Sequence, residues 1–145
     1  MKKLLIALVL AAGSLGHQAA QAQDAVGGDA LYQSLGEKAG ITAIADDFVN
    51  RMVADPRISA MFKNTKLPNL KEQLADQFCV LAGGPCKYEG DCMKAAHKDL
   101  GINKANFNQV VELLQLAMDG RGVPFREQNK LLALLAPMHR DIVTP

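Results

Sequence analysis

The sequence has no tryptophan, and aromatic residues make up only 5% of its 145 positions. It also lacks an excess of charge, because 16 lysines and arginines stand against 15 aspartates and glutamates. A nucleic-acid-binding protein needs a concentrated basic patch, so this balance argues against that class. Hydrophobic residues nevertheless reach 49%. A core of this size has to be built mainly from aliphatic residues and methionine, and the chain length suits one compact domain.

The N-terminus has the residue order of a secretory signal. Lys2 and Lys3 precede the apolar run Leu4–Leu10, and Ala20-Gln21-Ala22 offers small residues for cleavage after Ala22. The apolar run is short for a membrane span, which makes a retained helical anchor the weaker alternative. We expect three segments along the chain: a signal peptide over 1–22, a flexible lead over 23–28 and one domain over 29–145. The protein is therefore expected to be exported, to the periplasm or outside the cell.

Apolar residues recur at helical spacing through most of the domain, whereas alternating strand patterns, repeats and coiled-coil heptads are missing. The spacing predicts an all-α fold. The expected helical segments are 29–35, 41–52, 70–81, 93–100, 103–120 and 124–138. Nothing in this pattern indicates a membrane surface or a large apolar stripe for a partner, so a monomer is expected.

Glycine, proline and asparagine mark the expected helix ends. Gly36 and Gly40 flank a turn, and Asn103 suits the N-cap of the segment that follows it. Pro124 suits the first position of the last helix, where its missing N–H costs nothing. Pro137 should disrupt the final turns of that helix.

Few residues offer catalytic chemistry. Removal of the signal takes His17 away, so His97 and His139 are the imidazoles of the mature chain. Asp46 and Asp47 are adjacent on a helix and do not face each other. No phosphate-binding loop, zinc-ligand spacing or C-x-x-C-H motif is present. A lone histidine such as His97 is usually only a partly buried side chain, but a porphyrin supplies four iron ligands and needs one from the protein.

Short motifs along the domain occur in the order and at the spacing of a known family. They are Leu31-Tyr32-Gln33-Ser34-Leu35-Gly36, Asp47-Phe48, Asp55-Pro56-Arg57-Ile58 with Phe62, Gly83-Gly84-Pro85 with Tyr88 and Gly90, Met93-Lys94-Ala95-Ala96-His97, Gly101-Ile102 with Phe107, Gly122-Val123-Pro124, and Leu135-Ala136-Pro137. With these motifs the chain resembles the group I truncated haemoglobins over residues 29–143. The resemblance implies a two-over-two helical sandwich that holds haem b non-covalently.

The resemblance also implies the roles of individual residues. His97 would be the proximal iron ligand, Phe62 an aromatic wedge on the haem face and Phe48 part of the distal wall. Tyr88 would lie near the haem edge, where a propionate contact and plain loop packing are both open. The full set expected around the haem is His97, Phe62, Phe48, Val49, Leu70, Leu74, Phe78, Tyr88 and Met93.

Two departures from the family pattern concern the distal side. Val49 stands where the family usually has tyrosine, and Leu70 and Leu74 stand where it often has a polar residue. Bound O2 carries partial negative charge and is favoured by a hydrogen-bond donor, so an apolar pocket predicts fast O2 loss and poor discrimination between O2 and CO. Gln73 and Gln77 are expected to be solvated, although an inward swing of Gln73 would supply a substitute donor.

We therefore expect a haem protein that binds the diatomic gases O2, NO and CO at a five-coordinate iron. The apolar pocket argues against a dedicated oxygen carrier. The alternative is a redox enzyme, such as a nitric oxide dioxygenase or a peroxidase-like protein, with an electron-transfer partner. A haem-free helical interaction module is a third reading, and His97 argues against it.

In some family members a histidine near position 139 bonds to a haem vinyl group, but the place of His139 near the C-terminus favours a plain surface histidine.

Three cysteines lie in the domain, so an oxidising compartment would leave one pair and one thiol. Gly83-Gly84-Pro85 can fold the chain back and bring Cys86 near the last helical turn that holds Cys79. We expect a Cys79–Cys86 disulfide with Cys92 as the spare thiol. A Cys86–Cys92 pair remains the rival.

Overall fold

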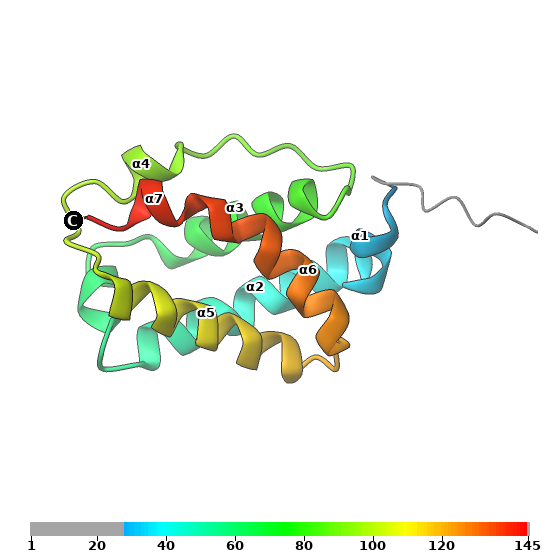
Figure 1. The fold of residues 1–145 in the computed structure, drawn as a ribbon, viewed down its shortest axis with the longest axis horizontal. Helices are drawn as coiled ribbons and strands as arrows, with labels where there is room; N and C mark the ends of the chain where they lie inside the picture. The colour runs from blue at the N-terminus through cyan, green and yellow to red at the C-terminus, as the bar shows by residue number, and fades with distance from the viewer. Residues whose placement is uncertain (1–27, 145) are drawn as a thin grey trace, which may run out of the picture.

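The protein was analysed as a computed structural model, which describes residues 28–144. Within that range the chain is helical and contains no strand (Figure 1). The elements are α1 (Ala30–Ser34), α2 (Glu37–Ala54), the 3-10 turn η1 (Ser59–Phe62), α3 (Leu67–Leu81), α4 (Met93–Ala96), α5 (Lys104–Asp119), α6 (Phe125–Leu135), the 3-10 turn η2 (Ala136–Met138) and α7 (His139–Ile142). The expected signal peptide and all of the lead except Gly28 lie outside the described residues.

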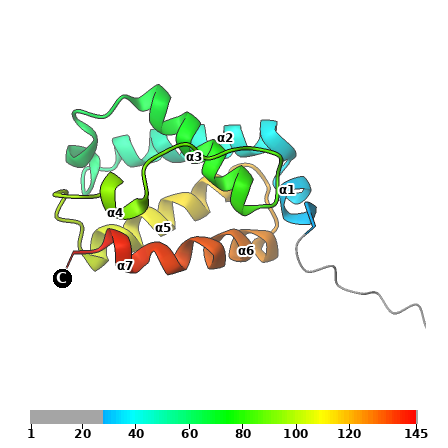
Figure 2. The ribbon, with the colours of Figure 1, turned by 90° about the horizontal axis from the view of Figure 1, so that it is seen from above.

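The long helices form two pairs that pack on each other. Helix α2 packs against α3 and also against α5, and α6 contacts both α5 and α3. Figure 2 shows α2 and α3 on one side, with α5 and the line of α6 and α7 on the other. This is the two-over-two sandwich that the sequence predicts. In the described part of the chain, no helix combines the length and apolar character needed to cross a bilayer.

The core lies where α2 meets its two partner helices. Helix α2 is the central element because its buried side chains fall on faces turned toward both α3 and α5. Those side chains are Ile41, Ile44, Ala45, Phe48, Val49 and Met52. Aliphatic residues and methionine therefore do most of the packing, as the scarcity of aromatics predicts.

Local chemistry explains where several helices begin and end. The side chains of Asn103 and Asn106 form a reciprocal capping box at the start of α5, which confirms the predicted N-cap. Helix α6 ends at Leu135, and the segment around Pro137 continues as a 3-10 turn, as a proline inside a helix predicts. Pro124 is the N-cap of α6 and not its first helical residue.

The boundaries predicted at Gly36 and Gly40 and at residue 100 are wrong. No turn spans Gly36 to Gly40: α2 begins directly after Gly36, which has φ +84°, and Gly40 lies inside the helix. A Cβ at Gly40 would collide with the carbonyl oxygen of Leu35, so glycine serves a close approach there. The helix expected over 93–100 ends at Ala96, because His97 already leaves the helical conformation with φ −110°, and Asp99 then has a left-handed backbone with φ 62°.

Candidate functional site

A cavity of about 630 Å³ is lined by residues of α2, η1, α3, α4 and α5 and of the loop that joins α3 to α4. Its volume is in the range typical of sites for small ligands and cofactors. Of the residues that the sequence places around a cofactor, seven line this cavity: Phe48, Phe62, Leu70, Leu74, Tyr88, Met93 and His97. The fold thus brings α2, η1, α3 and α4 together around one largely apolar space.

His97 lies directly after the last residue of α4 and is half-buried at the cavity wall. Its Nδ1 lies 2.8 Å from the backbone carbonyl oxygen of Met93. A carbonyl oxygen can only accept, so Nδ1 carries the proton and donates. In the neutral form of the ring this tautomer leaves the lone pair of Nε2 free to ligate a metal, the arrangement usual for metal-binding histidines.

Val49 and Phe78 do not line the cavity. Both are buried in the core, with Val49 fully enclosed and Phe78 packed behind Phe48 at a ring-centroid distance of 6.2 Å. Phe48 itself reaches the cavity. Phe78 therefore supports the cavity wall through Phe48, and Val49 belongs to the core.

The expectation that Gln73 and Gln77 are solvated is wrong. Gln77 is only 8% exposed, and both glutamines line the cavity. The Oε1 atom of Gln73 is buried and has no hydrogen-bond partner among the described residues. The spacing could have predicted that both glutamines face the cavity, because Leu70, Gln73, Leu74 and Gln77 follow the i, i+3, i+4, i+7 pattern of one helix face.

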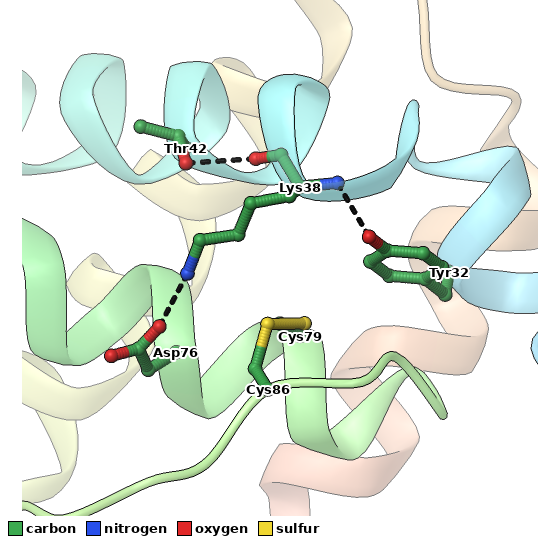
Figure 3. A network of polar contacts seen from close by, with 6 residues as sticks. All are labelled: Tyr32, Lys38, Thr42, Asp76, Cys79 and Cys86. Atoms are coloured by element: carbon green, nitrogen blue, oxygen red, sulfur yellow. Dashed lines mark hydrogen bonds and ion pairs between the residues drawn. A yellow bond between two sulfur atoms is a disulfide. The ribbon is translucent and has the colours of Figure 1, made fainter.

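A disulfide joins Cys79, in the last turn of α3, to Cys86 in the following loop. This is the favoured pairing, and Cys92 is left as an exposed thiol. Figure 3 shows the disulfide beside Tyr32, which belongs to α1. A side chain at Gly84 would collide with both the Tyr32 ring and the Cys79 sulfur, so glycine allows this close packing.

The polar contacts in Figure 3 tie the same corner to α2. The hydroxyl of Tyr32 accepts a hydrogen bond from the backbone N–H of Lys38, at 3.0 Å. The ammonium group of Lys38 forms an ion pair with Asp76 of α3. Helices α1, α2 and α3 are therefore linked next to the disulfide, at the end of α3 where the loop begins.

The loop over 85–92 forms one edge of the cavity. Tyr88 and Asp91 both line the cavity, and the Tyr88 hydroxyl donates to the Asp91 carbonyl oxygen at 2.8 Å. Burial raises the pKa of the Tyr88 phenol, and the nearby Asp91 and Cys92 add to the effect. The phenol therefore stays protonated at neutral pH and acts as a hydrogen-bond donor.

His139 lies apart from this cavity. Its ring packs edge-on against Phe107, with centroids 4.8 Å apart, and it lines a separate open hollow with Lys104 and Arg140. Phe107 is among the residues that line the main cavity, whereas His139 is not. The phenylalanine ring therefore lies between the imidazole and the candidate site.

The donor set fits a haem better than a bare metal ion. Within residues 28–144 no three side chains of the His, Cys, Asp or Glu type come together as a metal site. His97 offers one imidazole at the wall of an apolar cavity. A porphyrin brings four nitrogen ligands of its own and a large apolar surface, so one imidazole and an apolar space satisfy it.

Comparison with known proteins agrees with this geometry. The family model of the bacterial-like globins matches residues 30–144. A group 1 truncated haemoglobin of Mycolicibacterium paratuberculosis is 30% identical over 114 residues, which cover 79% of this chain and 84% of that protein. A group 1 truncated haemoglobin of Synechocystis is 33% identical over 122 residues, which cover 78% and 96% respectively.

Solved structures show the same fold. The Fe(III) form of a truncated haemoglobin from Tetrahymena pyriformis has a TM-score of 0.76 at 27% identity, and the match covers 79% of this chain and 98% of that one. A 2/2 haemoglobin from Synechococcus, solved in the cyanomet state with covalently attached haem, has a TM-score of 0.73 at 25% identity, covering 78% and 97%.

Proposed function

This chain belongs to the bacterial-like globin family, with group 1 truncated haemoglobins as its relatives, and on that premise we propose that it holds haem b through His97 and binds diatomic gases. Haem binding belongs to the family. The identity of the ligating residue, the non-covalent attachment and the choice among O2, NO and CO are specific to this proposal. His97 would hold the haem by ligating its iron, and the bound haem would supply the metal to which a diatomic gas can bind.

The observation that carries the proposal is the hydrogen bond from the His97 ring to the Met93 carbonyl oxygen at the cavity wall. Nδ1 of His97 donates to the Met93 carbonyl oxygen, with the nitrogen and oxygen 2.8 Å apart, so Nε2 is the nitrogen available to a metal. The ring is half-buried and borders a cavity of about 630 Å³. An imidazole with one nitrogen already engaged is oriented and made more basic for the metal on the other side.

The other lining residues would seat the macrocycle and exclude water. Phe48, Phe62 and Leu74 present apolar surface to the cavity. Burying a flat apolar ring against such a wall is worth roughly 25 cal/mol for each Å² removed from water. Tyr88 and Gln73 lie at the polar edge, where a phenol and an amide can meet the charged groups of a haem.

The distal side supports gas binding with weak stabilisation of O2. Leu70 and Leu74 face the cavity and have no polar atoms in their side chains, and Val49 is buried in the core. Two glutamines also line the space, but the amide nitrogen of Gln77 contacts the sulfurs of Met93 and Met138, and the side-chain oxygen of Gln73 lies against the loop at Gly90. We infer that O2 leaves quickly and that CO, which needs a donor far less, is bound comparatively well.

The test is an absorption spectrum of the purified protein, ferric and ferrous, during titration with hemin. The wild type is expected to bind one hemin and show a Soret band that shifts when CO is added. His97→Ala should lose the five-coordinate ferrous spectrum or bind hemin far more weakly. His139→Ala is the matched control, because it removes the other imidazole of the domain from outside the cavity. A protein that stays colourless, or a His97→Ala variant with the wild-type spectrum and affinity, would overturn the proposal.

A further inference from the structure

We propose that Gln77 is a positioning residue for the iron ligand: it holds Met93, and through the Met93 carbonyl it fixes the imidazole of His97. The inference rests on the proposed function, because it concerns how the haem-binding imidazole is held. It assigns a role to a glutamine whose polar side chain was expected to be solvated.

Gln77 links three segments at one end of the cavity. Its Nε2 lies 3.6 Å from the sulfur of Met93 in α4 and 3.7 Å from the sulfur of Met138 in η2. An amide nitrogen has two protons, so each can point to one sulfur. Among the side-chain hydrogen bonds of residues 28–144, the contact with Met93 is the one that joins α3 to α4.

The burial of Gln77 needs a reason beyond packing. The residue is 8% exposed, and thioether sulfur is a weak acceptor for its amide. Leucine has a similar size and would fill the space without burying a polar group that is poorly paired. The amide adds a directional contact, which points to Met93, the first residue of α4.

Helix α4 is only one turn long and packs mainly against α7, so a directional contact from α3 adds a restraint on Met93. Its residues Lys94, Ala95 and Ala96 are exposed, so they contribute little burial of their own. The carbonyl oxygen of Met93 accepts from the backbone N–H of His97 at 3.1 Å and from its ring Nδ1 at 2.8 Å. Both the backbone and the ring of His97 therefore take their position from Met93.

A double-mutant cycle on the hemin-loaded protein tests this chain of contacts. The variants are Gln77→Leu, Met93→Leu and the combination, and Met93→Leu keeps the backbone carbonyl while removing the sulfur. The readouts are the iron–histidine stretching frequency of the ferrous protein and the rate of hemin transfer to excess apomyoglobin. We expect each single variant to shift the frequency and to speed hemin loss about tenfold, the lower end of outer-shell effects on metal affinity. The combined variant should go no further than either single one, because both break the same link.

Gln128→Leu is the control for general destabilisation. Gln128 is also a buried glutamine, with 1% exposure, but it binds Asp119 and the carbonyl of Val123 at the corner of α5 and α6. It should lower the free energy of unfolding without shifting the iron–histidine frequency. An unchanged frequency in Gln77→Leu, or shifts that add in the combined variant, would overturn the inference while leaving haem binding intact. If Gln77→Leu does not fold, Met93→Leu alone has to show the shift. Failure of the wild type to load hemin would instead overturn the proposed function.

Discussion

Reduction of the Cys79–Cys86 disulfide should loosen the edge of the cavity as well as lower stability. The bond closes a loop of eight residues, since the two cysteines are seven positions apart. Treating the wild-type protein with a phosphine reductant breaks the bond without changing any side chain in the core. This matters because Cys79 is fully buried, and any substitution there would also disturb packing.

The expected magnitude follows from chain entropy. A closed loop of eight residues stabilises the folded state by about 2.5 kcal/mol in the chain-entropy model of disulfides. For a domain of this size that corresponds to a fall in Tm of about 10 °C. The bond is one of few restraints on its loop, because residues 85–91, all of them described, form no backbone-to-backbone hydrogen bonds.

The same loop lines the cavity, so haem retention should respond too. Tyr88 and Asp91 border the cavity and are tied to each other by one hydrogen bond. Once Cys86 is released from α3, the loop can move away from the cavity more easily. Hemin loss should therefore be several-fold faster in the reduced protein.

The assay compares urea unfolding and hemin transfer in oxidised and reduced protein at equal pH. Cys92→Ser serves as the control, because Cys92 is the exposed free thiol and its substitution prevents disulfide exchange. This variant should match the wild type when oxidised and lose the same 2.5 kcal/mol, approximately, when reduced. Equal stability and equal hemin loss in both redox states would refute the reasoning. If Cys92→Ser, without any reductant, is as unstable as the reduced wild type, Cys92 takes part in the disulfide.

Three further outcomes are expected. The side chain of Arg57 chiefly lowers the pKa of the Asp55 carboxyl. Its contribution to stability is therefore present above about pH 4 and is lost as the pH falls through the lowered pKa. The acid unfolding curve of Asp55→Asn should lack this pH-dependent loss of stability, and a curve identical to that of the wild type would contradict the assignment. Leu74→Gln places an amide at the cavity wall. A hydrogen bond to a charged partner is worth about 1.5–3 kcal/mol, so O2 release measured by stopped-flow should slow by about ten- to a hundredfold. Release as fast as in the wild type would argue against an apolar distal wall. The intact mass of exported protein after acid denaturation should match residues 23–145 without haem. A retained N-terminus would exclude cleavage after Ala22, and a haem adduct on His139 would exclude non-covalent binding.

The sequence alone predicted the helical fold class, the order of the helices and a candidate iron ligand. Apolar spacing and breakers such as Pro137 predict an all-α chain because helix periodicity and proline geometry are local properties. His97 could be singled out because a single imidazole in an apolar, helical chain suits a haem. The Cys79–Cys86 pairing was also within reach, since Gly83-Gly84-Pro85 reverses the chain over a short distance.

Only the tertiary structure decided which side chains share the cavity. Val49 and Gln77 show why: the apolar residue lies in the core and the polar one borders the cavity, because the direction of a helix face depends on the helices packed against it. The end of α4 was likewise visible only in the structure, where His97 leaves the helical conformation and Asp99 has a left-handed backbone. The contact from Gln77 to Met93 joins α3 to α4 in space, and no local pattern predicts a hydrogen bond between separate elements.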